Sequence, residues 1–264
     1  MCPSVQTRQG DCVNAGTIKE NLLAHDSGST LPANRLLTRL PQQERVRFLA
    51  DCETVEAKSG QVLMGPRMRI THAWFPLDAV LSLGIAAGRK PDVLEVALVG
   101  REGMVGIPLL LGSTVSSLRA TVVRPGALLR IAVAPLRSHL HASEAVRQSL
   151  QQYVLVALAQ LAQAALCTRY HRVEGRLARW LLMTQDRAPP GPVHATHELL
   201  AATLGVRRAG VTQAAASLQG RELIAYHRGE LTVLNRPGLL AAACSCYAAD
   251  CASYTQGMRR IAAE

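Results

Sequence analysis

The side chains with the clearest chemistry in this 264-residue chain lie between Thr196 and Asn235. Arginine, glutamine and hydroxyl-bearing residues recur there on the side of a predicted helix that is left exposed. Arginine donates two hydrogen bonds to guanine, glutamine pairs with adenine, and hydroxyl groups bind phosphates or base edges. The pattern therefore predicts contact with double-stranded DNA. The candidate DNA-binding residues are Thr196, Arg207, Arg208, Thr212, Gln213, Ser217 and Arg228.

Two helices and a tight corner are needed to position these side chains. Thr196 is a favourable N-cap for a helix that ends near Leu204, and Gly205 is able to adopt the left-handed conformation of a corner. A second helix is predicted from about Arg207 to Gln219, which makes the unit a helix-turn-helix. Its inward-facing positions are apolar, with a small residue at the helix crossing. They are Leu200, Ala201, Leu204, Val206, Val211 and Ala214.

A hairpin is predicted directly after the second helix. Residues 223–226 and 231–234 read as two short strands, and residues 227–230 form the turn between them. Such a hairpin is a wing beside the recognition helix, and it places Arg228 at the tip, where phosphates lie. The alternative interpretation is two helices and a hairpin with a purely structural role.

The distribution of charge favours the DNA-binding interpretation. The chain has a formal net charge of +10 and a pI near 9.8, which favours polyanionic partners. Residues 168–237 hold ten arginines, no lysine and five acidic residues, a net charge of +5 over 70 residues. Residues 1–167 also carry +5, from 17 basic and 12 acidic residues, over more than twice the length. Positive charge is therefore concentrated around the helix-turn-helix.

The N-terminal half has a different pattern. After short helices between Asn34 and Leu49, brief extended runs alternate with glycine and proline. This pattern predicts a compact antiparallel β-roll or barrel. The expected strands are Val62–Met64, Ala73–Phe75, Val80–Ile85, Val93–Leu98, Ala120–Val123 and Leu128–Val133.

A long apolar helix is predicted from Glu144 to Thr168. Its apolar residues recur at alternating steps of four and three, a heptad seam that needs a partner surface. We expect a second copy of the chain to supply that surface in a homodimer, and packing on its own domain is the alternative. Glutamines interrupt the uncharged stretch 148–168, so we expect a buried helix and no membrane span. The candidate dimerisation residues are Leu150, Val154, Ala157, Leu161 and Ala164.

These elements divide the chain into five parts and define an α+β fold. We expect a flexible N-terminal tail (1–33), a β-roll domain (34–137), the dimerisation helix (138–169) and a winged helix-turn-helix (170–237). A C-terminal extension (238–264) is expected to be helical. One further helix, from Arg169 to Asp186, is predicted to open the winged domain, and residues 188–192, which include three prolines, end it.

Four stretches of this sequence resemble the Crp/Fnr family of bacterial transcription regulators. They are RLARWLLMTQDR at 176–187, LLAATLGVRRAGVTQAAASLQGRELI at 199–224, WFPLDAVLSL at 74–83 and VGREGMVGIPLLLG at 99–112. The resemblance covers residues 34–234. It implies a cyclic-nucleotide-binding-like roll, a homodimer on a near-palindromic operator, RNA polymerase as a candidate partner, and no enzymatic activity. It also places Arg208 at the family's base-reading arginine, although Ala209 stands where cyclic-nucleotide members carry Glu.

The resemblance also indicates where an effector would bind. Cyclic-nucleotide members use a Glu for the ribose hydroxyl and an Arg for the cyclic phosphate. Here Met104 stands at the Glu position, Glu102 lies two residues away, and Arg119 follows at the expected place. We therefore expect an unknown small-molecule effector other than cyclic AMP. A cyclic-nucleotide-responsive regulator and an effector-independent DNA-binding protein remain alternatives. The candidate effector residues are Glu102, Gly103, Met104, Gly106 and Arg119.

Cofactors are not expected. Seven cysteines and an N-terminus without a signal-peptide pattern favour the reducing cytoplasm. Iron-sulfur members of the family use closely spaced N-terminal cysteines, and the spacing of Cys2, Cys12 and Cys52 is a poor match to an iron-sulfur cluster. Three thiols at 244, 246 and 251 would suit zinc with a fourth ligand, but free cysteines on a terminal helix are the preferred interpretation. No nucleophile elbow, metal triad or phosphate loop supports an enzyme fused to the DNA-binding module.

Overall fold

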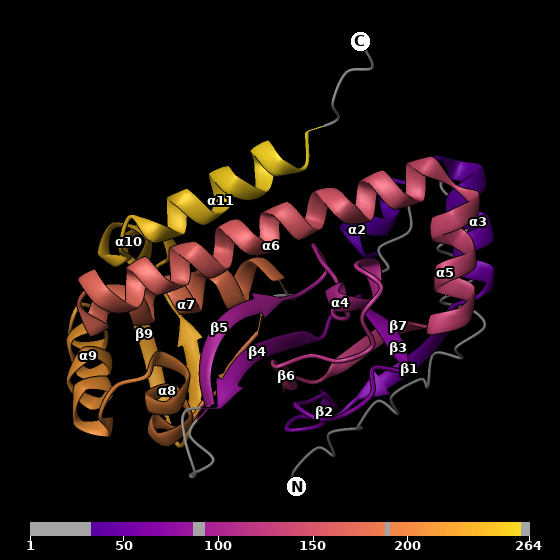
Figure 1. Ribbon diagram of the computed structural model, residues 1–264. Coiled ribbons are helices and arrows are strands. Elements are labelled where there is room, and N and C mark those ends of the chain that lie inside the picture. Colours follow the sequence, from indigo (N-terminus) through magenta and orange to yellow (C-terminus); the bar gives the residue numbers. More distant parts are fainter. Residues whose placement is uncertain (1–32, 87–92, 188–190, 260–264) are drawn as a thin grey trace, which may run out of the picture. The chain divides into compact units, whose positions relative to one another are not determined.

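The computed structural model describes residues 33–86, 93–187 and 191–259. All of them belong to one unit, which spans Pro32–Glu264. The predicted tail, except for residue 33, and the thiols Cys2 and Cys12 lie outside the described residues. The predicted α+β order of a β-roll, a long helix and a winged helix-turn-helix is confirmed (Figure 1).

Two short helices precede the roll. Helix α2 (Arg35–Thr38) is capped by Asn34, whose Oδ1 accepts hydrogen bonds from the amides of Leu36 and Leu37. The Asn34 amide group donates to the carbonyls of Pro76 and Gly103, at 3.0 and 2.9 Å. This buried side chain therefore ties the start of the fold to the roll. Helix α3 (Gln42–Ala50) follows Pro41.

The roll consists of two antiparallel sheets, in the orders β1-β7-β3 and β2-β6-β4-β5. The six predicted strands are present as β2 to β7. Strand β1 was missed because its sequence, ETVEA, lacks the apolar alternation of a half-buried strand. Two helices flank the last strands, α4 (Ile107–Leu110) and α5 (Val133–Ala142). The strands are β1 (Glu53–Ala57), β2 (Val62–Met64), β3 (His72–Pro76), β4 (Val80–Ala86), β5 (Val93–Val99), β6 (Arg119–Arg124) and β7 (Gly126–Ala132).

The long helix α6 spans Glu144–Tyr170, and Ser143 caps it by accepting from the amide of Val146. One side of α6 contacts strand β5, and helix α11 (Cys246–Gly257) lies along it (Figure 1). Among the described residues, α6 is the one helix long and apolar enough to cross a membrane, by length and composition only.

Helix α7 (Val173–Arg187) begins later than predicted. The predicted start at Arg169 is wrong, because α6 continues to Tyr170 and the chain then turns extended at His171 (φ −104°, ψ 145°). Helix α7 buries a broad apolar face. That face packs in one core with Val80 and Leu98 of the roll and with the helix-turn-helix. Each large apolar side chain buried in this way contributes roughly 1.5–3 kcal/mol.

The winged domain continues with α8 (His197–Leu204), α9 (Arg208–Gly220) and three antiparallel strands in the order β8-β10-β9. The strands are β8 (Val193–His194), β9 (Ile224–His227) and β10 (Glu230–Val233). Helix α10 (Arg236–Ala242) follows, with Asn235 as its N-cap, and leads to α11. The ion pair between Arg179 and Asp250, at 2.6 Å, fixes α11 to α7.

Candidate nucleic-acid interface

The corner between α8 and α9 has the predicted geometry. The Thr196 hydroxyl accepts from the amide of Leu199 at 3.1 Å, which caps α8. Gly205 is left-handed (φ 62°), and a Cβ there would lie 2.6 Å from Cδ1 of Leu94. Glycine is therefore needed at this position for both its backbone conformation and its close packing.

Helix α9 separates a buried face from a polar face. Its inner face buries Val211, Ala214, Ala215 and Leu218, while the predicted inward residue Val206 is half-buried. Most of the predicted DNA-binding side chains are exposed on the other face, and only Ser217 is half-buried there. The exposed ones are Arg207, Arg208, Thr212 and Gln213.

Two of these side chains already have partners on α8. Arg208 forms an ion pair with Glu198 at 2.8 Å, and both side chains are about two-thirds exposed (66% and 64%). An exposed pair of this kind contributes little, so Arg208 is free to exchange Glu198 for a base edge. The Thr212 hydroxyl donates to the carbonyl of Arg208 at 3.1 Å and lies 3.0 Å from Nδ1 of His197.

His197, Glu198 and Tyr226 were missed by the sequence analysis. The rings of His197 and Tyr226 stack at 4.7 Å and 11°, and the Tyr226 hydroxyl donates to the carbonyl of Ala195. These contacts connect the start of α8 to the wing. The sequence offered one signal for this group. Glu198 is an acidic residue in the first turn of α8, where the helix dipole favours a negative charge.

The wing ends in a two-residue turn. His227 and Glu230 pair across the strands, and both residues between them have positive φ, 49° for Arg228 and 82° for Gly229. This is the signature of a type I′ turn, which matches the twist of a hairpin. The side chain of Arg228 is exposed at the tip, as predicted from the sequence.

The structure does not gather the predicted effector residues around one cavity. Oε1 of Glu102 lies 2.9 Å from Nε of Arg187, and both side chains are at most 10% exposed. A Cβ on Gly103 would lie 2.0 Å from the hydroxyl oxygen of Tyr153, and Met104 is fully buried. Gly106 (φ 109°) packs against Ala73, whereas Arg119 is exposed at the start of β6.

A cavity of about 570 Å³ lies beside Glu102, and its described lining does not include Met104 or Arg119. Four of its charged groups form two ion pairs. Arg187 pairs with Glu102 at 2.9 Å, and Arg236 pairs with Asp186 at 2.6 Å. The Tyr254 hydroxyl of α11 also donates to the carbonyl of Glu102. The loop that the resemblance assigns to an effector is thus held by contacts within the chain.

The predicted dimerisation seam is only partly accessible. Leu150 is wrong as a dimer contact, because it is fully buried within its own chain. The other predicted residues, Val154, Ala157, Leu161 and Ala164, are half-buried. Two exposed leucines of α6 lie next to them, Leu155 at 65% and Leu158 at 57% exposure. The exposed stripe is rotated because strand β5 and helix α11 cover the other side of α6.

The cluster of cysteines in the structure differs from the one that the sequence suggested. Cys244 and Cys246 lie beside Cys167 and His171, whereas Cys251 is exposed on α11 and stands outside this group. Cys167 and His171 come from the end of α6, 73 or more residues earlier in the chain. Sequence spacing alone therefore could not reveal this cluster.

Comparisons with known proteins agree with this geometry. Residues 175–242 match the model of the Crp-like helix-turn-helix domain. The chain is similar in structure to a Crp/Fnr family transcriptional regulator from Eubacterium rectale (TM-score 0.61, 16% identity), covering 79% of this chain and 97% of that one. It is also similar to a Crp/Fnr family regulator from Thermus thermophilus (TM-score 0.56, 25% identity), covering 72% and 98%.

A third similar structure is the c-di-GMP responsive global regulator CLP from Xanthomonas campestris (TM-score 0.58, 14% identity). The match covers 73% of this chain and 99% of that one. No curated protein sequence matches the chain.

Proposed function

The chain carries a Crp-like helix-turn-helix domain on the fold of the Crp/Fnr transcription regulators, and from that premise we propose that it regulates transcription by binding a specific, near-palindromic operator as a homodimer. We expect it to act in the cytoplasm, with RNA polymerase as a candidate partner. No enzymatic activity is proposed.

The observation that carries this proposal is the polar face of α9 together with the tip of the wing. Arg207 at the N-cap of α9 and Arg208 and Gln213 on the helix are exposed, while the opposite face of α9 is buried, so their hydrogen-bond donors are available. In helix-turn-helix proteins, the first residues of the second helix contact base edges in the major groove. Arg208 stands at the first turn of α9 and suits guanine, while Arg228 at the wing tip suits phosphate.

A homodimer is supported by the exposed stripe on α6. Leu155, Leu158, Ala162 and Ala165 follow one another at steps of three, four and three, and all four are exposed. This spacing suits a parallel pair of helices across a twofold axis. Two copies of α9 would then contact half-sites about 10 base pairs apart, centre to centre.

The stripe is tested by replacing Leu158 with Glu. A charge in an apolar seam is expected to dissociate the dimer at low micromolar concentration, as measured by sedimentation. Ala145→Glu, at the half-buried start of the same helix and away from the stripe, is the control and should remain dimeric. A Leu158→Glu variant that stays dimeric would contradict the assignment of this helix.

We further propose that the roll responds to a signal other than cyclic AMP. The Met104 thioether cannot accept a hydrogen bond from a ribose hydroxyl with the strength of a carboxylate, and it is fully buried. Glu102, which could replace it, is engaged by Arg187. An effector-independent DNA-binding protein is the alternative. Calorimetry with cyclic AMP is expected to show no saturable binding at micromolar concentrations, whereas saturable binding abolished by Arg119→Ala would contradict this part of the proposal.

The experiment that tests the whole proposal is selection of bound duplexes from a random pool, with and without cell extract. We expect one near-palindromic consensus to be enriched. Enrichment that needs extract would indicate an effector, and enrichment without it would indicate effector-independent binding. A pool that stays random under both conditions would contradict sequence-specific recognition.

A further inference from the structure

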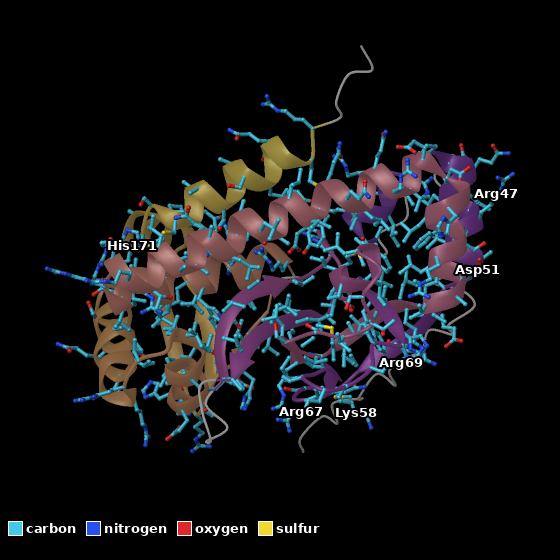
Figure 2. The ribbon with its side chains drawn as sticks, viewed as in Figure 1. Arg47, Asp51, Lys58, Arg67, Arg69 and His171 are labelled. Atoms are coloured by element: carbon cyan, nitrogen blue, oxygen red, sulfur yellow. The ribbon has the colours of Figure 1, made fainter. Side chains whose placement is uncertain are left out.

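Four side chains with metal-binding chemistry meet where α6 ends and α11 begins. They are Cys167, His171, Cys244 and Cys246, and one ligand atom from each lies within 4.8 Å of all the others. The Cys167 and Cys244 sulfurs are 3.5 Å apart, and Nδ1 of His171 is 3.2 Å from the Cys246 sulfur. The four residues come from two separate parts of the chain, 167–171 and 244–246, so the fold itself brings them together. Figure 2 labels His171 at the end of α6.

The dimensions of the cluster fit a tetrahedral zinc site. Zinc binds thiolates at about 2.3 Å and imidazole at about 2.0 Å, which places neighbouring ligand atoms about 3.5–3.8 Å apart. The two short distances in the cluster, 3.5 and 3.2 Å, lie at and just below the lower end of this range. Soft thiolate ligands select zinc over magnesium or calcium, and three cysteines with one histidine form a common structural zinc set.

The surroundings supply positive charge. Three thiolates and a neutral imidazole around Zn²⁺ leave a net charge of −1. Arg176 is only 7% exposed, and within the described residues it forms no ion pair with a carboxylate. Its guanidinium instead donates to the Thr168 hydroxyl and to the carbonyl of Leu204. A buried cation without a carboxylate partner is costly, and a thiolate site beside it would offset that cost.

A neutral side chain also contacts the cluster. The side-chain amide of Gln163 donates to the Cys246 sulfur at 2.9 Å. In metal sites, hydrogen-bond donors of this kind orient the side chains that bind the metal.

From this geometry we propose that Cys167, His171, Cys244 and Cys246 bind one Zn²⁺ ion per chain. With four protein ligands the site has no open position, so its role is structural rather than catalytic. The ion clamps the end of the long helix to the junction between α10 and α11. The ion thereby holds α11 in place. Other residues of α11 contact the Glu102 loop and Arg179. This inference does not depend on DNA binding.

Metal content of the purified full-length chain tests the proposal. The protein is prepared without a metal-binding tag, under reducing conditions, and dialysed against a weak chelator before elemental analysis. We expect one zinc per chain, with loss of that zinc in Cys244→Ser and Cys246→Ser. Cys251→Ser is the matched control, since this thiol lies on the same helix but outside the cluster, and it should keep its zinc. No zinc above trace in the wild type, or equal zinc in all variants, would overturn the proposal.

Cobalt substitution covers the case in which a serine variant fails to fold. Wild-type protein loaded with Co²⁺ should show thiolate-to-cobalt charge transfer and the intense visible absorption of a tetrahedral site. His171→Cys should keep the metal with a shifted spectrum, because a fourth thiolate is also a zinc ligand. A spectrum without thiolate charge transfer would overturn the proposal. So would a metal-free chain whose unreduced mass spectrum shows Cys167 linked to Cys244.

Amide hydrogen exchange reports the clamp. Removing the metal with a strong chelator should accelerate exchange at the start of α11, and it should leave exchange in the roll strands unchanged. Unchanged exchange at α11 after complete metal removal would contradict a clamping role.

Discussion

The α8–α9 corner and the loop from Gly100 to Gly106 both contain candidate binding residues. The corner leaves their polar side chains exposed, whereas the loop holds them in contacts within the chain. At the corner, the polar residues point to solvent and the apolar ones build the support, so residue type and exposure agree. In the loop, Glu102 and Gly103 are occupied by contacts with α7 and α6, namely Arg187 and Tyr153. A candidate binding residue is therefore informative when the fold leaves its polar atoms available.

The sharpest test of this contrast removes the partner of Glu102. Arg187→Ala should destabilise the protein by about 3–5 kcal/mol, because it leaves a buried carboxylate without its cation. Urea unfolding measures the loss. The double variant Arg187→Met with Glu102→Gln is expected to recover most of it, because no buried charge remains. A loss below about 1 kcal/mol, the range of exposed pairs, would show that Glu102 is available to a ligand.

A second test concerns Glu95, which joins the roll to the winged domain. Its carboxylate accepts from the Trp180 indole at 2.9 Å. Burial raises its pKa from 4.5 to about 7, against the opposing effects of Ser82, Trp180, Arg179 and Arg187. The folded state thus keeps its proton between pH 4.5 and 7 while the unfolded state loses it. The contribution of Glu95 to the free energy of unfolding therefore falls as the pH rises through this window, by on the order of 3 kcal/mol. It is lost above about pH 7.

Glu95→Gln should remove this fall. We expect urea unfolding of the variant to depend less on pH between about 5 and 7 than that of the wild type. The variant should also be relatively more stable at about pH 8. Glu56→Gln, an exposed glutamate on the other sheet, is the control and should follow the wild type. Parallel pH profiles for Glu95→Gln and the wild type would contradict the shifted pKa.

The corner is tested through Arg208. Arg208→Ala should cost about 1–3 kcal/mol on the preferred duplex and relax the preference at one symmetric pair of positions. Arg221→Ala is the matched control, because Arg221 is an exposed arginine just after α9, paired with Glu174. Fluorescence titrations against specific and scrambled duplexes measure both effects. Equal losses on both duplexes would remove Arg208 from base recognition.

The smallest expected effect belongs to the wing. Arg228→Ala should weaken binding to all duplexes similarly and lower the slope of log affinity against log salt by about one per site. The left-handed backbone at Arg228 suggests Arg228→Gly as a second variant, which removes the charge and relaxes the turn. A change in sequence preference in either variant would place Arg228 on a base rather than on phosphate.

Sequence reasoning worked best where local rules decide the structure. The Thr196 cap, the Gly205 corner and the wing turn depend on neighbouring residues, and each was predicted from them. The spacing of apolar residues also predicted the approximate extent of α6, but not which of its faces is exposed. That side is decided by where β5 and α11 pack, so Leu150 was assigned to the dimer although it is buried.

Contacts between distant segments were beyond prediction. Glu102 and Arg187 are 85 residues apart, and nothing in their local sequence indicates the pair. Cys167 and Cys244 are 77 residues apart. The cysteine interpretation therefore relied on spacing within the C-terminal segment and included Cys251 in place of Cys167 and His171.

The central claim is that α9 recognises a specific sequence, and equilibrium binding of the wild-type protein tests it most directly. Affinity is measured for the selected duplex and for a scrambled duplex of the same length, at several identical salt concentrations. The account predicts that the selected duplex binds at least about 10³-fold more tightly at physiological salt, the lower range for specific recognition. Equal affinities for the two duplexes, with the same salt slope, would contradict it.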